Sequence, residues 1–249
     1  MNDLRDVYDS NSNKRILGIT LARGNSKGIK NKNLALLNGM PLISYTISEA
    51  LKSQYLTEYI VSTDSPEIAQ ISKSLGAQVP FLRPSYLSSD TAKSSDALLH
   101  SLMFMESELQ TQFDYVVEIM ATNPFKTSHD IDSCIEMLSK YNCDSVIAVH
   151  RIYDNHPSRV KKINNGKIEN FCVDEEYESR RQDLSPPAYV RSGAIYALNR
   201  NWFIQNKRRY GSERSFAYIL DDQKSINIDS DLDLAVATAM MKTNRNYFK

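Results

Sequence analysis

The sequence lacks several features that mark special classes of protein. Lysine plus arginine and aspartate plus glutamate both number 30 among 249 residues, so the basic excess typical of nucleic-acid-binding proteins is missing. No apolar run approaches the length of a membrane span. The three cysteines form no CxxC pair, which argues against a disulfide framework or a zinc site and suits a reducing compartment. We therefore expect a cytoplasmic protein whose partners include neither a nucleic acid nor a membrane.

The first residues are polar and contain no apolar stretch, so we expect no signal peptide. Residues 1–14 are predicted to form a flexible N-terminal arm. Beyond them, short apolar runs alternate with helical periodicities as far as residue 150, which predicts an α/β fold with a mostly parallel sheet. The predicted strands are 16–22, 59–62, 115–120 and 145–149, and the predicted helices are 42–53, 66–76, 94–109 and 128–140.

This alternation stops after residue 150. Residues 151–190 are polar, and they contain one hairpin signal at Asn164-Asn165-Gly166. Strands are predicted again at 193–198 and 226–228, before a capping box at Ser230 to Asp233 that opens a last helix. We expect a core of residues 15–150 and 191–249, from which residues 151–190 protrude. The last helix is predicted to bury Leu232, Ala235, Val236, Ala239 and Met240.

The loop that follows the first predicted strand carries the strongest chemical signal. Ligands of open α/β sheets bind beyond the carboxyl ends of the strands, which is where residues 21–33 fall. Gly24 and Gly28 allow backbone N–H groups to approach oxygens closely, and Arg23, Lys27 and Lys32 offer charge to phosphates. Neither a Walker A ending nor a GxGxxG spacing is present. The loop predicts a triphosphate site, with a solvated basic turn as the alternative.

Four further polar segments can each be explained by a structural role when they are taken alone. Residues 83–94 and 122–127 are consistent with helix capping and turns, and the three arginines of residues 180–191 with surface ion pairs. Asp229 ends the short predicted strand at 226–228, where a carboxylate can hold Mg²⁺ together with nucleotide phosphates. Asp231 and Asp233 are better explained by the positive end of the helix that follows.

Taken together and in this order, these segments resemble the acylneuraminate cytidylyltransferases, or CMP-sialic acid synthetases, and within them the bacterial branch for legionaminic or pseudaminic acids. The likeness runs from residue 16 to about residue 242. It rests on ARGNSKGIKNKN (22–33), STD (62–64), GAQVPFLRP (76–84), SDTA (89–92), RRQDL (180–184), GAIY (193–196) and IDSDLDL (228–234).

The resemblance implies a Rossmann-like, three-layer α/β/α core and a homodimer in which residues 151–190 cross to the second subunit. It also implies transfer of CMP from CTP to a nonulosonic acid, an acidic 2-keto sugar, with Mg²⁺ as cofactor and pyrophosphate as by-product. The catalytic residues are expected to be Arg23, Lys27, Lys32 and Asp229, with Asp229 as the metal ligand. Nucleotide binding is expected at Asn33, Arg83, Ala92 and Ser94. Sugar binding is expected at Thr122, Asn123, Arg159, Arg181, Arg191 and Tyr196.

Some positions depart from the pattern of the family. Asn227 stands where relatives carry the first acid of a DID pattern, and Met120 replaces a glutamine that contacts the sugar. An arginine expected at Val190 is displaced to Arg191, and Ser192 replaces an asparagine. Two alternatives follow from these changes. The chain could be a catalytically weak, nucleotide-binding regulator, or it could use an eight-carbon Kdo-like sugar or another NTP.

Overall fold

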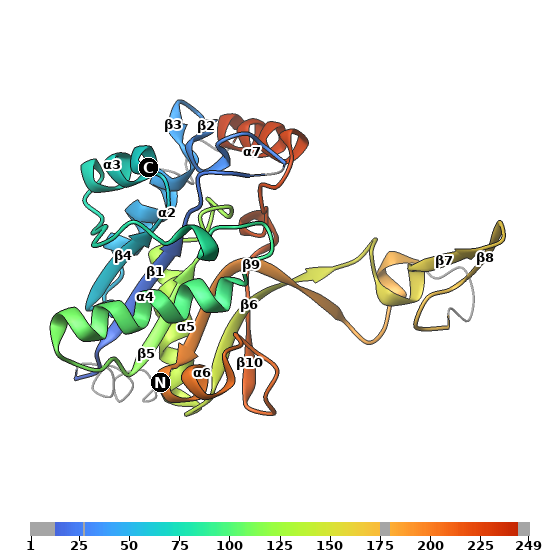
Figure 1. The fold of residues 1–249 in the computed structure, drawn as a ribbon. Coiled ribbons are helices and arrows are strands. Elements are labelled where there is room, and N and C mark those ends of the chain that lie inside the picture. Colours follow the sequence, from blue (N-terminus) through green and yellow to red (C-terminus); the bar gives the residue numbers. More distant parts are fainter. Residues whose placement is uncertain (1–12, 27, 175–179, 244–249) are drawn as a thin grey trace.

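A computed structural model describes residues 13–26, 28–174 and 180–243. At its centre is one six-stranded sheet with the order β10-β6-β9-β5-β1-β4 (Figure 1). β1 pairs in parallel with β4 and β5, and β6 pairs in parallel with β10, whereas β9 is antiparallel to both of its neighbours. The predicted mostly parallel sheet is therefore confirmed. The strands are β1 (Ile16–Leu21), β4 (Glu58–Ser62), β5 (Tyr115–Ile119), β6 (Ser145–Ile152), β9 (Ala188–Asn199) and β10 (Ser215–Ile219).

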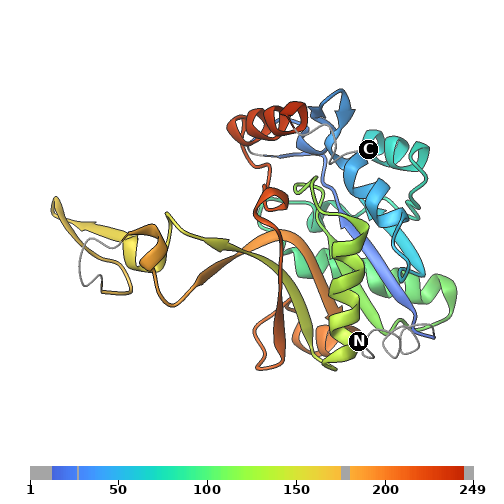
Figure 2. The ribbon, with the colours of Figure 1, turned by 180° about the vertical axis from the view of Figure 1, so that it is seen from behind.

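Helices cover both faces of this sheet, as Figures 1 and 2 show from opposite sides. One face packs against α2 (Leu42–Leu51), α3 (Pro66–Ser74) and α5 (Ser128–Lys140). The other packs against α4 (Ser94–Leu109) and α6 (Arg200–Asn206). β1 contributes Ile16 to the first core and Leu17 and Ile19 to the second, which explains why this strand is a continuous apolar run. The three-layer α/β/α prediction is confirmed.

Several predicted boundaries agree with the structure because local capping chemistry sets them. α4 and α5 begin and end at the predicted residues. α3 begins directly after Ser65, whose hydroxyl accepts a hydrogen bond from the Ile68 N–H at 3.3 Å. Before α5, the Asp130 carboxylate accepts hydrogen bonds from the N–H and the hydroxyl of Thr127 at 2.7 and 2.8 Å.

A long two-stranded ribbon leaves the sheet, because β6 and β9 continue to pair as far as Ile152 and Ala188 (Figure 1). The predicted boundaries at residues 150 and 191 fall within these two strands. The hairpin of β7 (Lys161–Asn164) and β8 (Lys167–Asn170) lies at the far end of the ribbon. Its turn has positive φ angles of 49° at Asn165 and 80° at Gly166, so the predicted hairpin is confirmed. We call residues 153–187 and the ribbon that carries them the arm.

The last part of the core differs from the prediction in two ways. Residues 226–228 are not a strand: they lie past the end of β5, where the Ile228 N–H donates to the Thr122 carbonyl at 2.7 Å. The buried face predicted for α7 (Asp231–Thr243) is also wrong, since Leu232 is 72% exposed and Val236 44% exposed. Ala235 and Ala239 are exposed too, and Met240 is only partly buried. Ala237 and Met241 are the buried positions, because α7 packs beside the small hairpin of β2 (Leu36–Leu37) and β3 (Met40–Pro41) and not on the sheet.

Two further observations bear on the remaining expectations. Across residues 13–26, 28–174 and 180–243, no helix has the length and apolar character needed to cross a membrane. All three cysteines are free thiols, with Cys134 and Cys143 buried and Cys172 exposed. Nearly all of the flexible N-terminal segment predicted at residues 1–14 lies outside the described residues.

Candidate active site

A cavity of about 510 Å³ opens beyond the carboxyl ends of β1 and β5. Segments far apart in the sequence meet there: the loop after β1, the polar segment before α4, the residue Thr122 after β5, and the residue Asp229 before α7. The structure thus gathers many of the predicted site residues around one space. Its lining includes Arg23, Lys32, Asn33, Arg83, Ala92, Ser94, Thr122 and Asp229.

The loop after β1 is held from both sides. Asn33 donates its amide N–H to the Arg23 carbonyl at 2.9 Å, and the Gly24 N–H donates to the Asp64 carboxylate at 2.9 Å. A Cβ atom on Gly28 would lie 2.1 Å from the Asp229 carbonyl oxygen, so this position has room for glycine only. The loop therefore packs directly on the backbone of Asp229. Lys27, a predicted catalytic residue, lies outside the described residues.

Carboxylates pair with Arg23 and Lys32, the two described basic side chains of this loop that line the cavity. Arg23 Nη1 lies 3.0 Å from Asp90 Oδ1 and donates to the Ser89 carbonyl at 3.2 Å. Lys32 Nζ lies 2.7 Å from Asp229 Oδ1. Both ion pairs are partly exposed to solvent, where such pairs are weak and easily exchanged. An incoming polyanion can therefore take over both cations.

Arg83 forms a fixed part of the cavity wall. Its side chain is almost fully buried; Nε donates to the Ser88 hydroxyl at 2.9 Å, and Nη2 lies 4.0 Å from Asp64 Oδ1. Burial lowers the pKa of Arg83, and the negative charge of Asp64 opposes that shift. A guanidinium remains protonated in proteins even so. The positive N-terminal end of α4, which begins at Ser94, borders the same cavity.

The Asp229 carboxylate does not cap the helix that follows it. The capping box of α7 is formed instead by Ser230 and Asp233, because the Ser230 N–H donates to Asp233 at 2.8 Å and the Asp233 N–H returns to the Ser230 hydroxyl at 3.3 Å. The Ser230 hydroxyl, which donates to the Asp233 carboxylate at 2.7 Å, lowers the pKa of Asp233 most, and the N–H groups of Asp229 and Ser230 lower it further. The predicted capping box is thus confirmed, and the Asp229 side chain remains available to a ligand.

The surroundings of Asp229 suit a divalent cation. The Asn227 amide N–H donates to the Asp229 carboxylate, while the amide oxygen of Asn227 is buried without a hydrogen-bond partner in the described structure. The hydroxyl of Thr122 is likewise buried and unsatisfied there. Oxygen donors of this kind are the ligands that hard cations prefer. Among the described residues there is no group of three or more acidic, histidine or cysteine side chains that could hold a metal ion.

The structure does not bring every predicted sugar-binding residue to the cavity. Asn123 is fully buried, and its amide donates to the Lys224 carbonyl at 3.0 Å and accepts from the Lys126 N–H at 3.2 Å. Tyr196 is buried under the guanidinium of Arg209, which lies 4.3 Å from its ring centroid. Arg191 is exposed and lies over the ring of Tyr210.

Arg159 and Arg181 belong to the arm, which projects from the side of the sheet (Figure 2). Arg159 lies 3.7 Å from the Asp154 carboxylate, and the guanidinium of Arg181 lies 4.4 Å from the ring centroid of Tyr153. Within one chain these arginines are part of the arm and not of the cavity lining. They can contribute to a cavity of this kind only from a second copy of the chain.

Sequence reasoning did not assign a role to two acids that position the basic residues. Asp64 directly follows β4 and accepts from Gly24, and Asp90 pairs with Arg23. Both lie in short motifs, STD and SDTA, that carried the family resemblance. The signal for Asp64 was its place at the end of a strand next to β1, where polar side chains meet the ligand-binding edge of the sheet.

Comparisons with known proteins agree with this geometry. The family model described as cytidylyltransferase matches residues 17–244. An N-acylneuraminate cytidylyltransferase of Escherichia coli is 33% identical over 235 residues, covering 93% of this chain and 53% of that protein. A CMP-N,N'-diacetyllegionaminic acid synthase of Legionella pneumophila is 31% identical over 240 residues, covering 93% of this chain and 98% of that protein.

Among solved structures, a CMP:2-keto-3-deoxy-manno-octonic acid synthetase complexed with CTP superposes with a TM-score of 0.68. It covers 92% of this chain and 99% of that chain at 17% identity, so it supports the fold alone. The family match extends over almost the whole described chain and includes every described residue that lines the cavity. The chain belongs to the cytidylyltransferase family.

Proposed function

We propose that the chain joins CMP from CTP to a nonulosonic acid and releases pyrophosphate. The observation that carries this proposal is the cavity beyond β1, which is lined by Arg23 and by the pair of Lys32 and Asp229. A triphosphate carries about four negative charges and calls for several fixed cations. The names of the two relatives, an N-acylneuraminate cytidylyltransferase and a CMP-N,N'-diacetyllegionaminic acid synthase, support the choice of sugar class.

The nucleotide is proposed to lie with its phosphates on the loop after β1. Arg23 and Lys32 exchange their carboxylate partners for phosphate oxygens, and Lys27 is proposed to join them. Asn33 supports the loop through the Arg23 carbonyl, so its role is to shape the phosphate site. The cytidine base is proposed to lie toward Arg83, Ala92 and Ser94, on the wall that leads into α4.

A divalent metal is the cofactor that this site fits, and we propose Mg²⁺. Asp229 would hold it, with the unsatisfied oxygens of Asn227 and Thr122 close by. The bound metal supplies positive charge to the phosphate oxygens of CTP. Mg²⁺ commonly uses one or two carboxylates and completes its shell with water and phosphate, so a single acid is enough.

In the proposed reaction the anomeric hydroxyl of the sugar attacks the α-phosphorus of CTP. A new oxygen–phosphorus bond forms, and the bond between the α-phosphorus and the bridging oxygen of the β-phosphate breaks. Its electron pair leaves on pyrophosphate, and the hydroxyl proton passes to water. Transfers of this type depend on alignment and on neutralisation of charge more than on covalent help from the protein. Arg23 and Lys32 are proposed to stabilise the charge that develops on the leaving pyrophosphate.

The sugar is proposed to bind between the cavity and the arm of a second subunit. Thr122 lines the cavity, and Arg159 and Arg181 would approach from the partner to meet the sugar carboxylate. Asn123, Arg191 and Tyr196 do not line the cavity, so no direct sugar contact is proposed for them within one chain. A homodimer follows from this arrangement, and the exposed Ile163 and Ile168 at the tip of the arm are apolar surface that a partner would cover. CTP as substrate and free thiols support a cytoplasmic location.

The proposal is tested by measuring pyrophosphate release with each of the four NTPs, Mg²⁺ and a panel of sugar acids. We expect turnover with CTP and nine-carbon acids, and little with an eight-carbon Kdo-like acid. If only Kdo among the sugar acids supported turnover, or if another NTP replaced CTP, the proposed substrates would be wrong. CTP binding with no turnover at any metal concentration would favour a regulator that has lost catalysis.

A further inference from the structure

A buried lysine lies beneath the loop that follows β5. Lys126 is 1% exposed, and its Nζ donates to the Met120 carbonyl at 2.6 Å, the Asn123 carbonyl at 2.6 Å and the Thr46 hydroxyl at 2.7 Å. Its charged form has three hydrogens, one for each acceptor. Lys126 therefore has no capacity left for a ligand. Its hydrogen bonds instead draw residues 120–126 into a closed loop.

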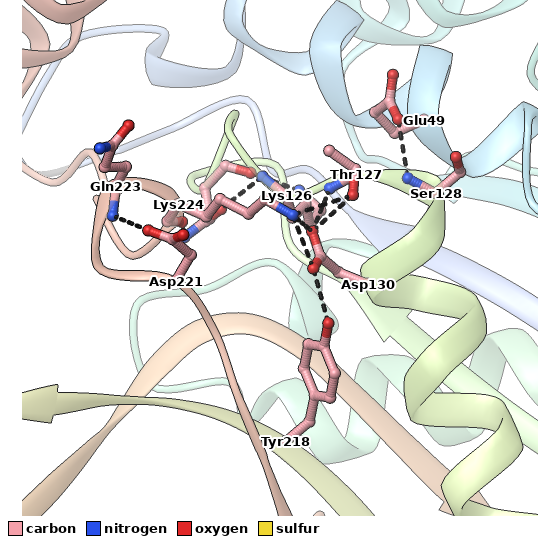
Figure 3. Close-up of polar contacts among 10 residues, drawn as sticks. Glu49, Lys126, Thr127, Ser128, Asp130, Tyr218, Asp221, Gln223 and Lys224 are labelled. Atoms are coloured by element: carbon pink, nitrogen blue, oxygen red, sulfur yellow. Dashed lines mark hydrogen bonds and ion pairs between the residues drawn. The ribbon is translucent and has the colours of Figure 1, made fainter. Parts of the chain in front are cut away.

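An ion pair holds the next residues of the chain, as Figure 3 shows. Lys224 Nζ lies 2.9 and 3.0 Å from the two carboxylate oxygens of Asp130, which is 2% exposed. The same carboxylate accepts from Thr127 and from the Tyr218 hydroxyl at 2.9 Å. This cluster joins the N-terminal end of α5, the strand β10 and the segment that leads to Asp229.

Two more hydrogen bonds directly connect loop 120–127 with segment 221–229. The Asn123 amide donates to the Lys224 carbonyl at 3.0 Å, and the Ile228 N–H donates to the Thr122 carbonyl at 2.7 Å. Loop 120–127 and segment 221–229 are thus joined at the ion pair and at both of these bonds. Asp229 is the residue directly after Ile228, so the position of its backbone depends on the closed loop that Lys126 maintains.

We propose that Lys126, together with the Asp130–Lys224 pair, is a positioning device for the metal site. It holds Thr122 and the Asn227–Asp229 segment at the separation that a divalent cation needs. The inference rests on the metal role of Asp229 in the proposed function, but it concerns residues that touch neither substrate nor metal. Burying an ammonium is costly unless every hydrogen is paired, so an apolar residue would have been the simpler filler for this space.

The decisive measurement is the affinity for Mn²⁺ in the presence of CTP at pH 6, below the pKa of about 7 of Lys126, so that its ammonium donates all three hydrogen bonds. Binding is monitored by the loss of the free-Mn²⁺ signal in electron paramagnetic resonance. Lys126→Met keeps the length of the side chain and removes its three hydrogen bonds. We expect it to weaken Mn²⁺ binding about tenfold, a change of about 1.4 kcal/mol. Lys126→Arg retains charge and donors and is expected to restore most of the affinity.

The matched control is Lys52→Met. A second cavity, of about 580 Å³, lies beside α2 and is lined by Lys52, Lys126 and Lys224. The side chain of Lys52 is 60% exposed and pairs with Glu49 of α2. We expect Lys52→Met to bind Mn²⁺ as the wild type does. Unchanged Mn²⁺ affinity in a Lys126→Met protein with native circular dichroism would overturn the proposal, as would an equal loss in Lys52→Met.

A second variant covers the case in which Lys126→Met does not fold. Asp130→Asn keeps the size of the side chain and removes the charge that holds Lys224, and it should also weaken Mn²⁺ binding. Wild-type Mn²⁺ affinity in Asp130→Asn would contradict the proposal. Pyrophosphate release by the wild type is measured separately. Its absence would contradict the proposed reaction, whereas a metal affinity that does not depend on Lys126 would contradict only the positioning role.

Discussion

Lys32 and Asp229 are 197 positions apart in the sequence, and their side chains meet at 2.7 Å. The contact joins the phosphate loop after β1 to the residue that precedes the last helix. In the proposed reaction these two groups have different ligands, since the lysine binds phosphate and the carboxylate binds metal. In this ion pair Lys32 therefore lies where Asp229 would bind the metal, and Asp229 lies where Lys32 would bind phosphate.

Asp229→Asn is expected to remove most activity at ordinary Mg²⁺ concentrations, because an amide offers an oxygen without charge. Asn227→Asp should lower the Mg²⁺ concentration that gives half-maximal turnover, because it adds a second charged ligand beside the first. Both are checked by titrating Mg²⁺ against pyrophosphate release. If Asp229→Asn kept near-normal turnover, the carboxylate would have no metal role.

Arg23→Ala is expected to lower turnover about a hundredfold, or about 2–3 kcal/mol, through loss of a charge-assisted phosphate contact. The side chain is partly exposed in a loop, so its removal leaves no core cavity, and the melting temperature should hardly change. Arg214→Ala is the control, since Arg214 is exposed and is not part of the cavity lining. Equal activities of the two variants would contradict the phosphate role of the loop.

Gly28→Ala is expected to impair turnover and raise the Mg²⁺ requirement together. The new Cβ would lie 2.1 Å from the Asp229 carbonyl oxygen, so the loop and the metal ligand must move apart. Gly39→Ala serves as the comparison, because that glycine has a positive φ of 84° and no atom near its Cβ position. It carries the backbone strain of a side chain in the left-handed region, about 1–2 kcal/mol, but no collision. A larger loss of activity in Gly39→Ala would count against this reasoning.

Lys126 should make stability depend on pH. Burial lowers the pKa of Lys126 from 10.5 to about 7, with Glu49 of α2 and Asp130 of α5 opposing the shift and Lys224 close to Asp130. Between these two values the unfolded chain binds one more proton than the folded chain. The free energy of unfolding should therefore rise with pH from about 7 upward, by at most about 1.4 kcal/mol per pH unit.

Lys126→Met lacks this group, so its stability should not show that rise. Urea unfolding of both proteins at pH 6, 7.5 and 9 gives the difference in the free energy of unfolding. The wild type is expected to gain relative to the variant between pH 7.5 and 9. Parallel curves over the whole range would mean that the lysine keeps its ordinary pKa.

Mixing Arg23→Ala subunits with Arg181→Ala subunits should recover activity that neither has alone. Half of randomly formed dimers are mixed, and each mixed dimer has one site with an intact cavity and an intact arm, so recovery should approach about a quarter of wild-type activity. Arg23→Ala mixed with Lys32→Ala is the control, because both changes fall in the cavity lining, so that every site of a mixed dimer has a damaged cavity. Recovery in the control, or its absence in the test, would contradict an arm that acts on the partner.

The sequence predicts the core well where local chemistry marks an element. α3 and α5 begin at capping residues that are visible as Ser65 and Thr127. It predicts α7 poorly. Alanine, leucine, valine and methionine occur on all sides of this helix, so the hydrophobic periodicity does not select one face for burial. β10 was not predicted, since it is an edge strand with half-exposed residues and no strong alternation.

The candidate site shows the same division. Charge and position after a strand were enough to indicate Arg23, Lys32 and Asp229. The partners Asp90 and Asp64 depend on how distant loops meet, which periodicity does not encode. Lys126 looked like an ordinary loop lysine, and only its burial against three oxygen acceptors reveals its place in the structure.

The arm grows directly out of two neighbouring strands of the sheet, and this limits how its reach can change. Adding one residue to a single strand would turn its following side chains to the opposite face, so the tip would present the wrong surface. Adding two residues to both β6 and β9 keeps every face and moves the tip outward by about 7 Å. The reach of such an arm can therefore be adjusted only in paired, even-numbered steps, and intermediate lengths require a bulge such as the irregularity between Ile147 and Val149.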